Sequence, residues 1–84
     1  MDATEKLLQE LTDAYGVPGH ESEIAAIMKK HLEADADEIG YDKLGSFIAT
    51  KKGTQERPRV MIAGHMDEVG FMVREIDKNG YIRF

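Results

Sequence analysis

The sequence contains no cysteine and no tryptophan, and it has only two prolines among its 84 residues. Without cysteine the chain forms no disulfide and offers no thiolate metal ligand. Any metal must therefore bind through histidine and carboxylate side chains. The absence of cysteine also fits a reducing compartment, and we expect a cytoplasmic protein.

Basic residues are also outnumbered by acidic ones. The sequence has 11 Lys and Arg residues and 16 Asp and Glu residues, which gives a formal net charge of -5. Binding to nucleic acid or to a membrane surface needs clustered basic residues. The pairs Lys29–Lys30 and Lys51–Lys52 are too short for such a cluster. No apolar run approaches the roughly 20 residues that a membrane span needs, and the first ten residues lack the pattern of a signal peptide. We therefore expect neither nucleic acid nor a membrane among the partners.

Two helices are predicted in the first third of the chain. Asp2 and Glu5 have the spacing of a capping box, and Gly16 ends the first helix. The second helix begins near residues 20–22 and frays after Leu32. The predicted apolar stripes comprise Leu7, Leu8, Leu11, Ala14 and Tyr15 in the first helix, and Ile24, Ala25, Ile27, Met28 and Leu32 in the second. Two histidines in this region, His20 and His31, are expected to be ordinary helix residues rather than ligands.

Strand patterns follow from residue 38 onward. Strands are predicted at residues 39–41, 47–50, 60–63, 69–76 and 81–84, with turns at residues 44–46 and 77–80. Because Val60–Ala63 is wholly apolar, this strand is predicted to be covered on both faces. The expected fold class is α/β, with two helices followed by the strands of a layered sheet. The sheet is expected to be incomplete, because a doubly covered strand needs more helices than this chain supplies.

The segment after Val60–Ala63 carries the candidate chemistry, because ligands bind at the carboxyl ends of strands in open α/β sheets. His65 and Asp67 are two positions apart, so their side chains point to the same side of an extended segment. An imidazole that binds a metal through one nitrogen usually donates its other N–H to an acceptor such as a carboxylate. His65 is therefore the candidate metal ligand and Asp67 its orienting partner, while Glu68 is a weaker candidate. An ordinary hydrogen bond in a surface turn remains the alternative.

Three stretches resemble the M42 family of metallo-aminopeptidases, the group of glutamyl aminopeptidases and tetrahedral (TET) peptidases. Residues 63–73, AGHMDEVGFMV, resemble the first metal-site motif of that family. Gly16–Glu21 is similar to its Gly-x-x-Gly-x-Glu turn between the first two helices. Asp42–Ser46 is similar to its Asp-x-x-Gly-Asn/Ser turn between early strands. Together these stretches extend the resemblance over nearly the whole chain.

The resemblance implies a two-metal enzyme, with zinc or cobalt, that removes N-terminal residues from peptides. It implies that His65 binds one metal and that Asp67 is the catalytic-motif Asp that orients it. Residues 1–68 would then belong to the catalytic domain, and residues 69–84 would cross into a β-rich dimerisation domain, at which the layered sheet ends. The other ligands and the general base have no counterpart in this chain. Isolated activity is therefore not expected, and dimer-based oligomers, including dodecamers, are the implied assembly.

Three alternatives stay open at this point. Other co-catalytic zinc peptidases and deacylases also place His-x-Asp after a strand. A glucanase label exists within the family, but a glycosidase needs two carboxylates across a cleft, and the adjacent Asp67 and Glu68 do not provide them. The chain could also be a non-catalytic subunit that lends strands to a partner chain or to a complementing remainder of the enzyme.

Overall fold

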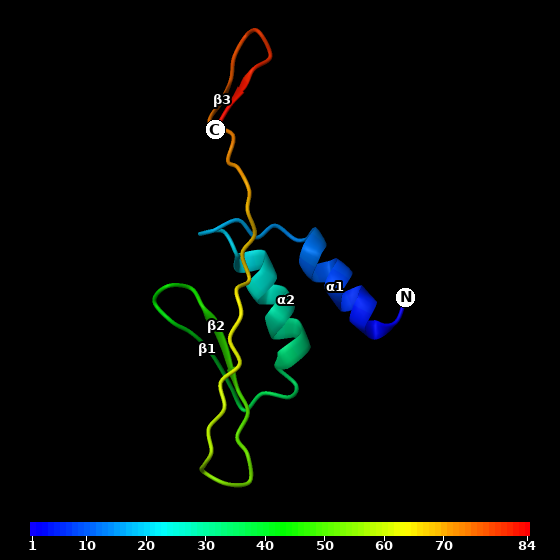
Figure 1. The fold of residues 1–84 in the computed structure, drawn as a ribbon, viewed down its shortest axis with the longest axis vertical. Helices are drawn as coiled ribbons and strands as arrows, with labels where there is room; N and C mark the ends of the chain where they lie inside the picture. Colours follow the sequence, from blue (N-terminus) through cyan, green and yellow to red (C-terminus); the bar gives the residue numbers. More distant parts are fainter.

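Two helices form where the amphipathic spacing predicts them. In the computed structural model, which describes residues 1–84, α1 spans Ala3–Asp13 and α2 spans Ser22–Leu32 (Figure 1). The capping box is confirmed, because the Asp2 carboxylate accepts from the Glu5 N–H at 2.8 Å and the Glu5 carboxylate accepts from the Asp2 N–H at 2.9 Å. These two bonds satisfy N–H groups that the first helical turn otherwise leaves unpaired.

The core between the helices is small. Its buried apolar residues are Ala14, Ile24 and Ala25. The first predicted stripe is partly wrong, because the side chains of Leu8 and Tyr15 are 62% and 81% exposed. Since α2 covers only one side of α1, and no other helix or strand of this chain covers the rest, these two residues remain in solvent.

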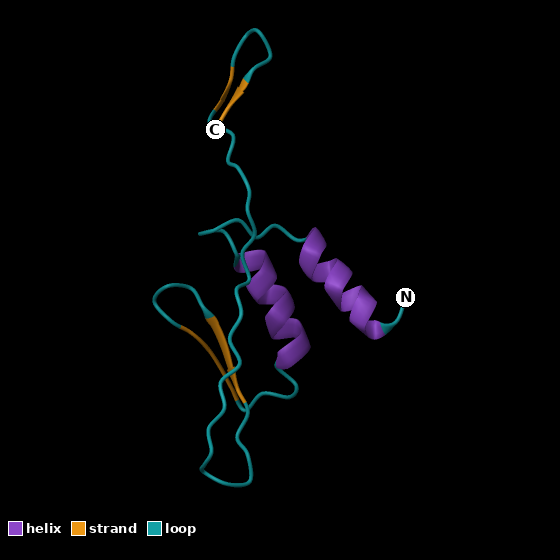
Figure 2. Ribbon diagram, in the orientation of Figure 1, coloured by secondary structure: helices purple, strands orange, loops and turns teal.

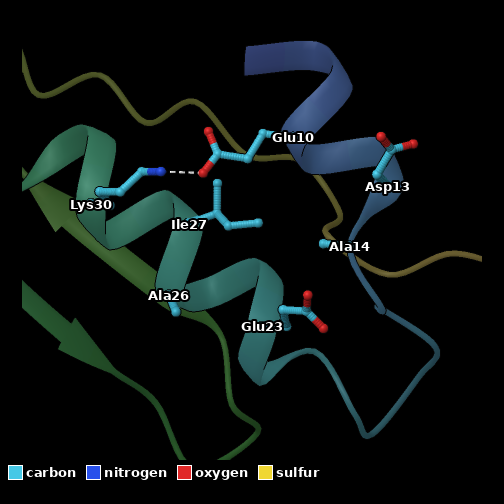
Figure 3. Close-up of a pocket in the computed structure, with 7 residues that line it drawn as sticks. All are labelled: Glu10, Asp13, Ala14, Glu23, Ala26, Ile27 and Lys30. Carbon is cyan, nitrogen blue, oxygen red and sulfur yellow. Dashed lines mark hydrogen bonds and ion pairs between the residues drawn. The ribbon is translucent and has the colours of Figure 1, made fainter. Parts of the chain in front are cut away.

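An ion-pair cluster joins the polar edges of the two helices. Glu10 on α1 binds Lys30 and, at 2.9 Å, His31 Nε2 on α2. Glu10, Ile27 and Lys30 line a groove of about 490 Å³, and Figure 3 shows Glu10 facing Lys30 above Ile27. The hydrogen bonds from Lys30 and then from His31 hold the pKa of Glu10 below its ordinary value. His31 thus has a structural partner, as expected of a packed helix residue.

Two antiparallel hairpins supply all the strands (Figure 2). In the first, β1 (Glu38–Tyr41) pairs with β2 (Phe47–Thr50), and the aromatic rings of Tyr41 and Phe47 meet edge to face at 5.7 Å. In the second, β3 (Glu75–Ile76) pairs with β4 (Ile82–Arg83). The predicted strands at residues 39–41 and 47–50 are confirmed, whereas those at residues 69–76 and 81–84 shrink to two residues each.

The two hairpins use the same turn chemistry. The sequences DKLGS and DKNGY each begin with an Asp whose Oδ1 accepts two backbone N–H groups, from Leu44 and Ser46 at Asp42 and from Asn79 and Tyr81 at Asp77. Each turn places a glycine in the left-handed region, with φ of 90° at Gly45 and 86° at Gly80. No other residue type has positive φ, so each turn fits the three-residue loop in which a glycine forms a bulge.

The prediction of a doubly covered strand at Val60–Ala63 is wrong for this chain. Residues 51–74 form neither helix nor strand, and Val60, Met61 and Ile62 are 83%, 88% and 95% exposed. The sequence pattern of a buried strand is present, but a strand needs a neighbour to pair its backbone groups. Residues 60–63 make no backbone–backbone hydrogen bond with any other segment, so that ladder does not form.

The molecule is elongated as a result. Its radius of gyration is 17.4 Å, whereas a compact domain of this length has about 12 Å. The second hairpin stands apart from the helices and the first hairpin at one end of the long axis (Figure 1). No helix of the chain is both long enough and apolar enough to cross a bilayer.

Candidate functional site

The structure brings the two candidate residues together. His65 Nδ1 lies 3.2 Å from Asp67 Oδ1 and 2.9 Å from the backbone carbonyl oxygen of Asp67. The His65 side chain is 85% exposed, whereas that of Asp67 is 38% exposed. The pair therefore presents an accessible imidazole that is held from behind by a partly covered carboxylate.

The neighbours of Nδ1 decide the proton position on the His65 ring. A carbonyl and a carboxylate oxygen are both acceptors, so Nδ1 carries the hydrogen and donates it. In the neutral ring this leaves the lone pair of Nε2 available, and no hydrogen bond or ion pair of the chain occupies that atom. This arrangement is that of metal-binding histidines, in which a second hydrogen bond fixes the tautomer and the ring orientation.

A groove of about 720 Å³ runs beside the pair. Three parts of the chain line it besides residues 62–68: the end of α1 with the following turn, α2, and the turn between β1 and β2. Figure 1 shows the segment around residue 65 passing between α2 and the first hairpin. His65, Asp67 and Glu68 contribute the polar wall of the groove, while Ile24, Met28 and Phe47 are among its apolar lining.

Glu68 is placed by its backbone rather than by its side chain. Its N–H donates to the carbonyl oxygen of Gly16 at 2.7 Å, in the turn between α1 and α2. Sequence reasoning missed this contact. The Gly-x-x-Gly-x-Glu pattern at Gly16–Glu21 predicted the turn, but it did not indicate that the backbone of Glu68 binds to this turn.

The residues present fit one ligand position of a metal site and no more. His65 offers Nε2, and Asp67 holds the other ring nitrogen. No group of three or more His, Asp or Glu side chains gathers anywhere in the chain. His20 is exposed and His31 binds Glu10, so neither joins His65. A complete metal site would therefore need ligands from outside these 84 residues.

Two family models match the sequence. The model described as M42 glutamyl aminopeptidase covers residues 45–84, which include His65 and Asp67, and a model described as AMPT covers residues 2–28. Among solved structures, the TET aminopeptidase from a marine sediment archaeon of the Thaumarchaeota superposes with a TM-score of 0.83. It is 47% identical, and the match covers 96% of this chain and 23% of that one.

Over residues 45–84, which contain His65 and Asp67, the chain is similar to the M42 glutamyl aminopeptidase family. Its curated relatives include an Escherichia coli K12 protein named "Putative aminopeptidase FrvX", 49% identical over 94% of this chain and 22% of the relative. The lysyl aminopeptidase of Pyrococcus furiosus is 43% identical over 93% of this chain and 22% of the relative. The chain thus spans about a fifth of the length of the proteins it matches.

The family-model match and the similar proteins confirm the resemblance found in the sequence, and the structural match confirms the α/β fold class. The chain's helices and antiparallel strands correspond to part of the solved TET aminopeptidase. The roles of His65 and Asp67 are a separate matter, which rests on their geometry.

Proposed function

We propose that this chain is part of an aminopeptidase that hydrolyses N-terminal residues from peptides, and that it contributes one metal ligand to the active site. The observation that carries the proposal is the fixed imidazole of His65. Its Nδ1 is bound by Asp67, its Nε2 is free, and it lies within the stretch that the M42 model matches. The proposal concerns the complete polypeptide, because the chain covers 22% or 23% of its relatives.

The chain's own residues act by orientation in this proposal. Asp67 accepts a hydrogen bond from the Nδ1–H of His65, which fixes the ring and keeps Nε2 directed outward. The adjacent backbone carbonyl of Asp67 accepts from the same N–H and limits rotation of the ring. A pair of divalent ions, zinc or cobalt, would polarise the peptide carbonyl and provide a nucleophilic water at neutral pH when bound. His65 would hold one of these ions.

The division of the chain and its surroundings also belong to the proposal. Residues 1–68 are assigned to the catalytic domain, and residues 69–84 to the start of a β-rich dimerisation domain. The separate position of the second hairpin supports this division. A dimer-based oligomer is supported by the TET aminopeptidase match and by the exposed apolar side chains of this hairpin, such as Ile76 and Tyr81. A cytoplasmic location is supported by the cysteine-free composition.

The experiment uses the complete polypeptide that carries this chain. We expect it to release the first residue from unblocked peptides and from aminoacyl-anilides, to lose activity with a chelator, and to recover it with zinc or cobalt. N-acetylated versions of the same peptides are the matched control and should stay intact. Cleavage that is indifferent to N-acetylation would overturn the aminopeptidase assignment. Chelator-resistant release of reducing sugar from a glucan would favour the glycosidase alternative.

A further inference from the structure

The candidate site is attached to the rest of the fold through one short turn. Residues 53–73 make a single backbone–backbone hydrogen bond, from the Glu68 N–H to the Gly16 carbonyl oxygen at 2.7 Å. This segment lies in no helix or strand, so no ladder fixes it. The turn between α1 and α2 therefore provides the main polar restraint on the stretch that holds His65 and Asp67.

Close packing reinforces that hydrogen bond on both sides. A Cβ atom at Gly16 would lie 2.8 Å from Ile24 Cγ1 and 3.3 Å from the Met66 carbonyl oxygen. A Cβ atom at Gly70 would overlap Val17 Cγ1. Distances of this kind are shorter than ordinary carbon contacts, so both positions need glycine for the two backbones to approach.

The contact points alternate with the candidate site residues. The turn touches the segment at Met66, Glu68 and Gly70, whereas His65 directly precedes Met66 and Asp67 lies between Met66 and Glu68. Since successive residues of an extended chain face opposite ways, a shift at these contacts rotates the neighbouring side chains as well. The same contacts that hold the backbone thus determine where His65 Nε2 is directed.

We propose that Gly16, Val17 and Gly70 are positioning residues, which interlock the turn between the helices with the His65–Asp67 segment and set the direction of the metal-binding imidazole. The inference rests on the proposed aminopeptidase function and names how its site is held in place. Displacement of a reacting group by 1 Å can lower a rate by about 100-fold, so this interlock should control activity without touching substrate.

The test is a double-mutant cycle in the complete polypeptide. Gly70→Ala places a methyl group against Val17, and we expect kcat/KM to fall by about 10- to 100-fold, mainly through kcat, with weaker binding of zinc. Val17→Ala alone should lower kcat/KM by less than Gly70→Ala does, because it removes one packing contact while the Glu68–Gly16 hydrogen bond remains. The double variant should recover most of the loss, since the shortened side chain makes room for the added methyl.

Gly40→Ala is the matched control, because a Cβ atom at Gly40 in β1 meets nothing within 4 Å. It should leave both kcat/KM and zinc affinity unchanged. Gly70→Ala with unchanged kinetics and zinc affinity overturns the proposal, as does a loss that Val17→Ala does not relieve. If Gly70→Ala fails to fold by circular dichroism, a folded and active double variant supports the interlock, and an unfolded or inactive one overturns it.

The proposed function is tested separately by His65→Ala in the same protein. If His65→Ala loses activity while Gly70→Ala does not, only the positioning role is rejected. If His65→Ala keeps full activity and metal content, the proposed site itself is wrong.

Discussion

At the scale of single residues, the orientation of His65 is the property that the proposed chemistry needs. We predict that His65→Ala in the complete protein lowers metal content at one site and reduces kcat/KM by at least about 100-fold, because a direct ligand matters more than its orienting partner. His20→Ala is the matched control, since His20 is exposed and contacts no candidate residue. Metal analysis together with aminoacyl-anilide kinetics measures both effects.

Asp67 should act through His65 and not as a ligand. Asp67→Asn retains an oxygen acceptor near Nδ1 but removes the negative charge that favours proton donation from the ring. We therefore expect metal affinity to fall by about 10- to 100-fold with the site still able to load at high metal concentration. Competition titration with a metal-binding dye gives the affinity. An Asp67→Asn protein that binds metal as tightly as the unchanged one contradicts the orienting role.

The sequence allowed the His65–Asp67 contact to be predicted, because a spacing of two residues places both side chains on one side of an extended chain. The attachment of Glu68 to Gly16 could not be predicted in this way. It joins residues 52 positions apart, and neither glycine spacing nor apolar pattern specifies which distant backbone approaches. Local geometry is readable from sequence, whereas the restraint that holds it is a tertiary contact.

At the scale of elements, the turn of the first hairpin depends on Asp42. The hydrogen bonds from the backbone N–H of Ser46, foremost, and of Leu44 hold the pKa of this carboxyl below its ordinary value. Because the pKa is lowered in the folded state, the stabilisation is present above the unfolded-state pKa. It is lost as pH falls through the folded-state pKa. We therefore predict that the first hairpin weakens as the pH falls from the ordinary carboxyl range toward the lowered pKa of Asp42.

Amide chemical shifts of Leu44 and Ser46 during an acid titration follow this opening. Asp42→Ala should abolish the acid-dependent change and weaken the hairpin at neutral pH. Asp77→Ala makes the equivalent change in the second hairpin and should leave the Leu44 and Ser46 signals as they are, since the two hairpins do not share a sheet. Unaltered acid dependence in Asp42→Ala would assign the transition to another group.

Local chemistry also explains which elements were predictable. Both helices and the first hairpin carry their own signals, namely the capping box, the amphipathic spacing and the Asp-x-x-Gly turn, and the structure confirms that all three elements form. The apolar run Val60–Ala63 carries a strand signal just as clear, yet it forms no strand. A helix pairs its backbone N–H and C=O groups within itself, whereas a strand pairs them only with a neighbouring strand. The apolar pattern of Val60–Ala63 therefore predicts a strand that this chain cannot form without such a neighbour.

At the scale of the whole molecule, the balance between burial and exposure sets what the chain can do alone. Only 4 of its 84 residues are buried, and large apolar side chains such as Ile62, Phe71 and Phe84 are more than 70% exposed. Apolar surface of this extent favours association. The candidate site is also incomplete. It offers one imidazole with an orienting carboxylate, whereas a pair of metal ions needs several more ligands.

We therefore predict that the isolated 84-residue chain neither binds a zinc pair tightly nor cleaves aminoacyl-anilides, while the complete polypeptide does both. Isothermal titration with zinc and a chromogenic assay at matched concentrations make the comparison, with His65→Ala in each background as the control. Any weak zinc binding by the isolated chain should disappear in His65→Ala if it occurs at the proposed ligand. Metal-dependent turnover by the purified, intact 84-residue chain would show that these residues, or copies of them in association, assemble a complete site.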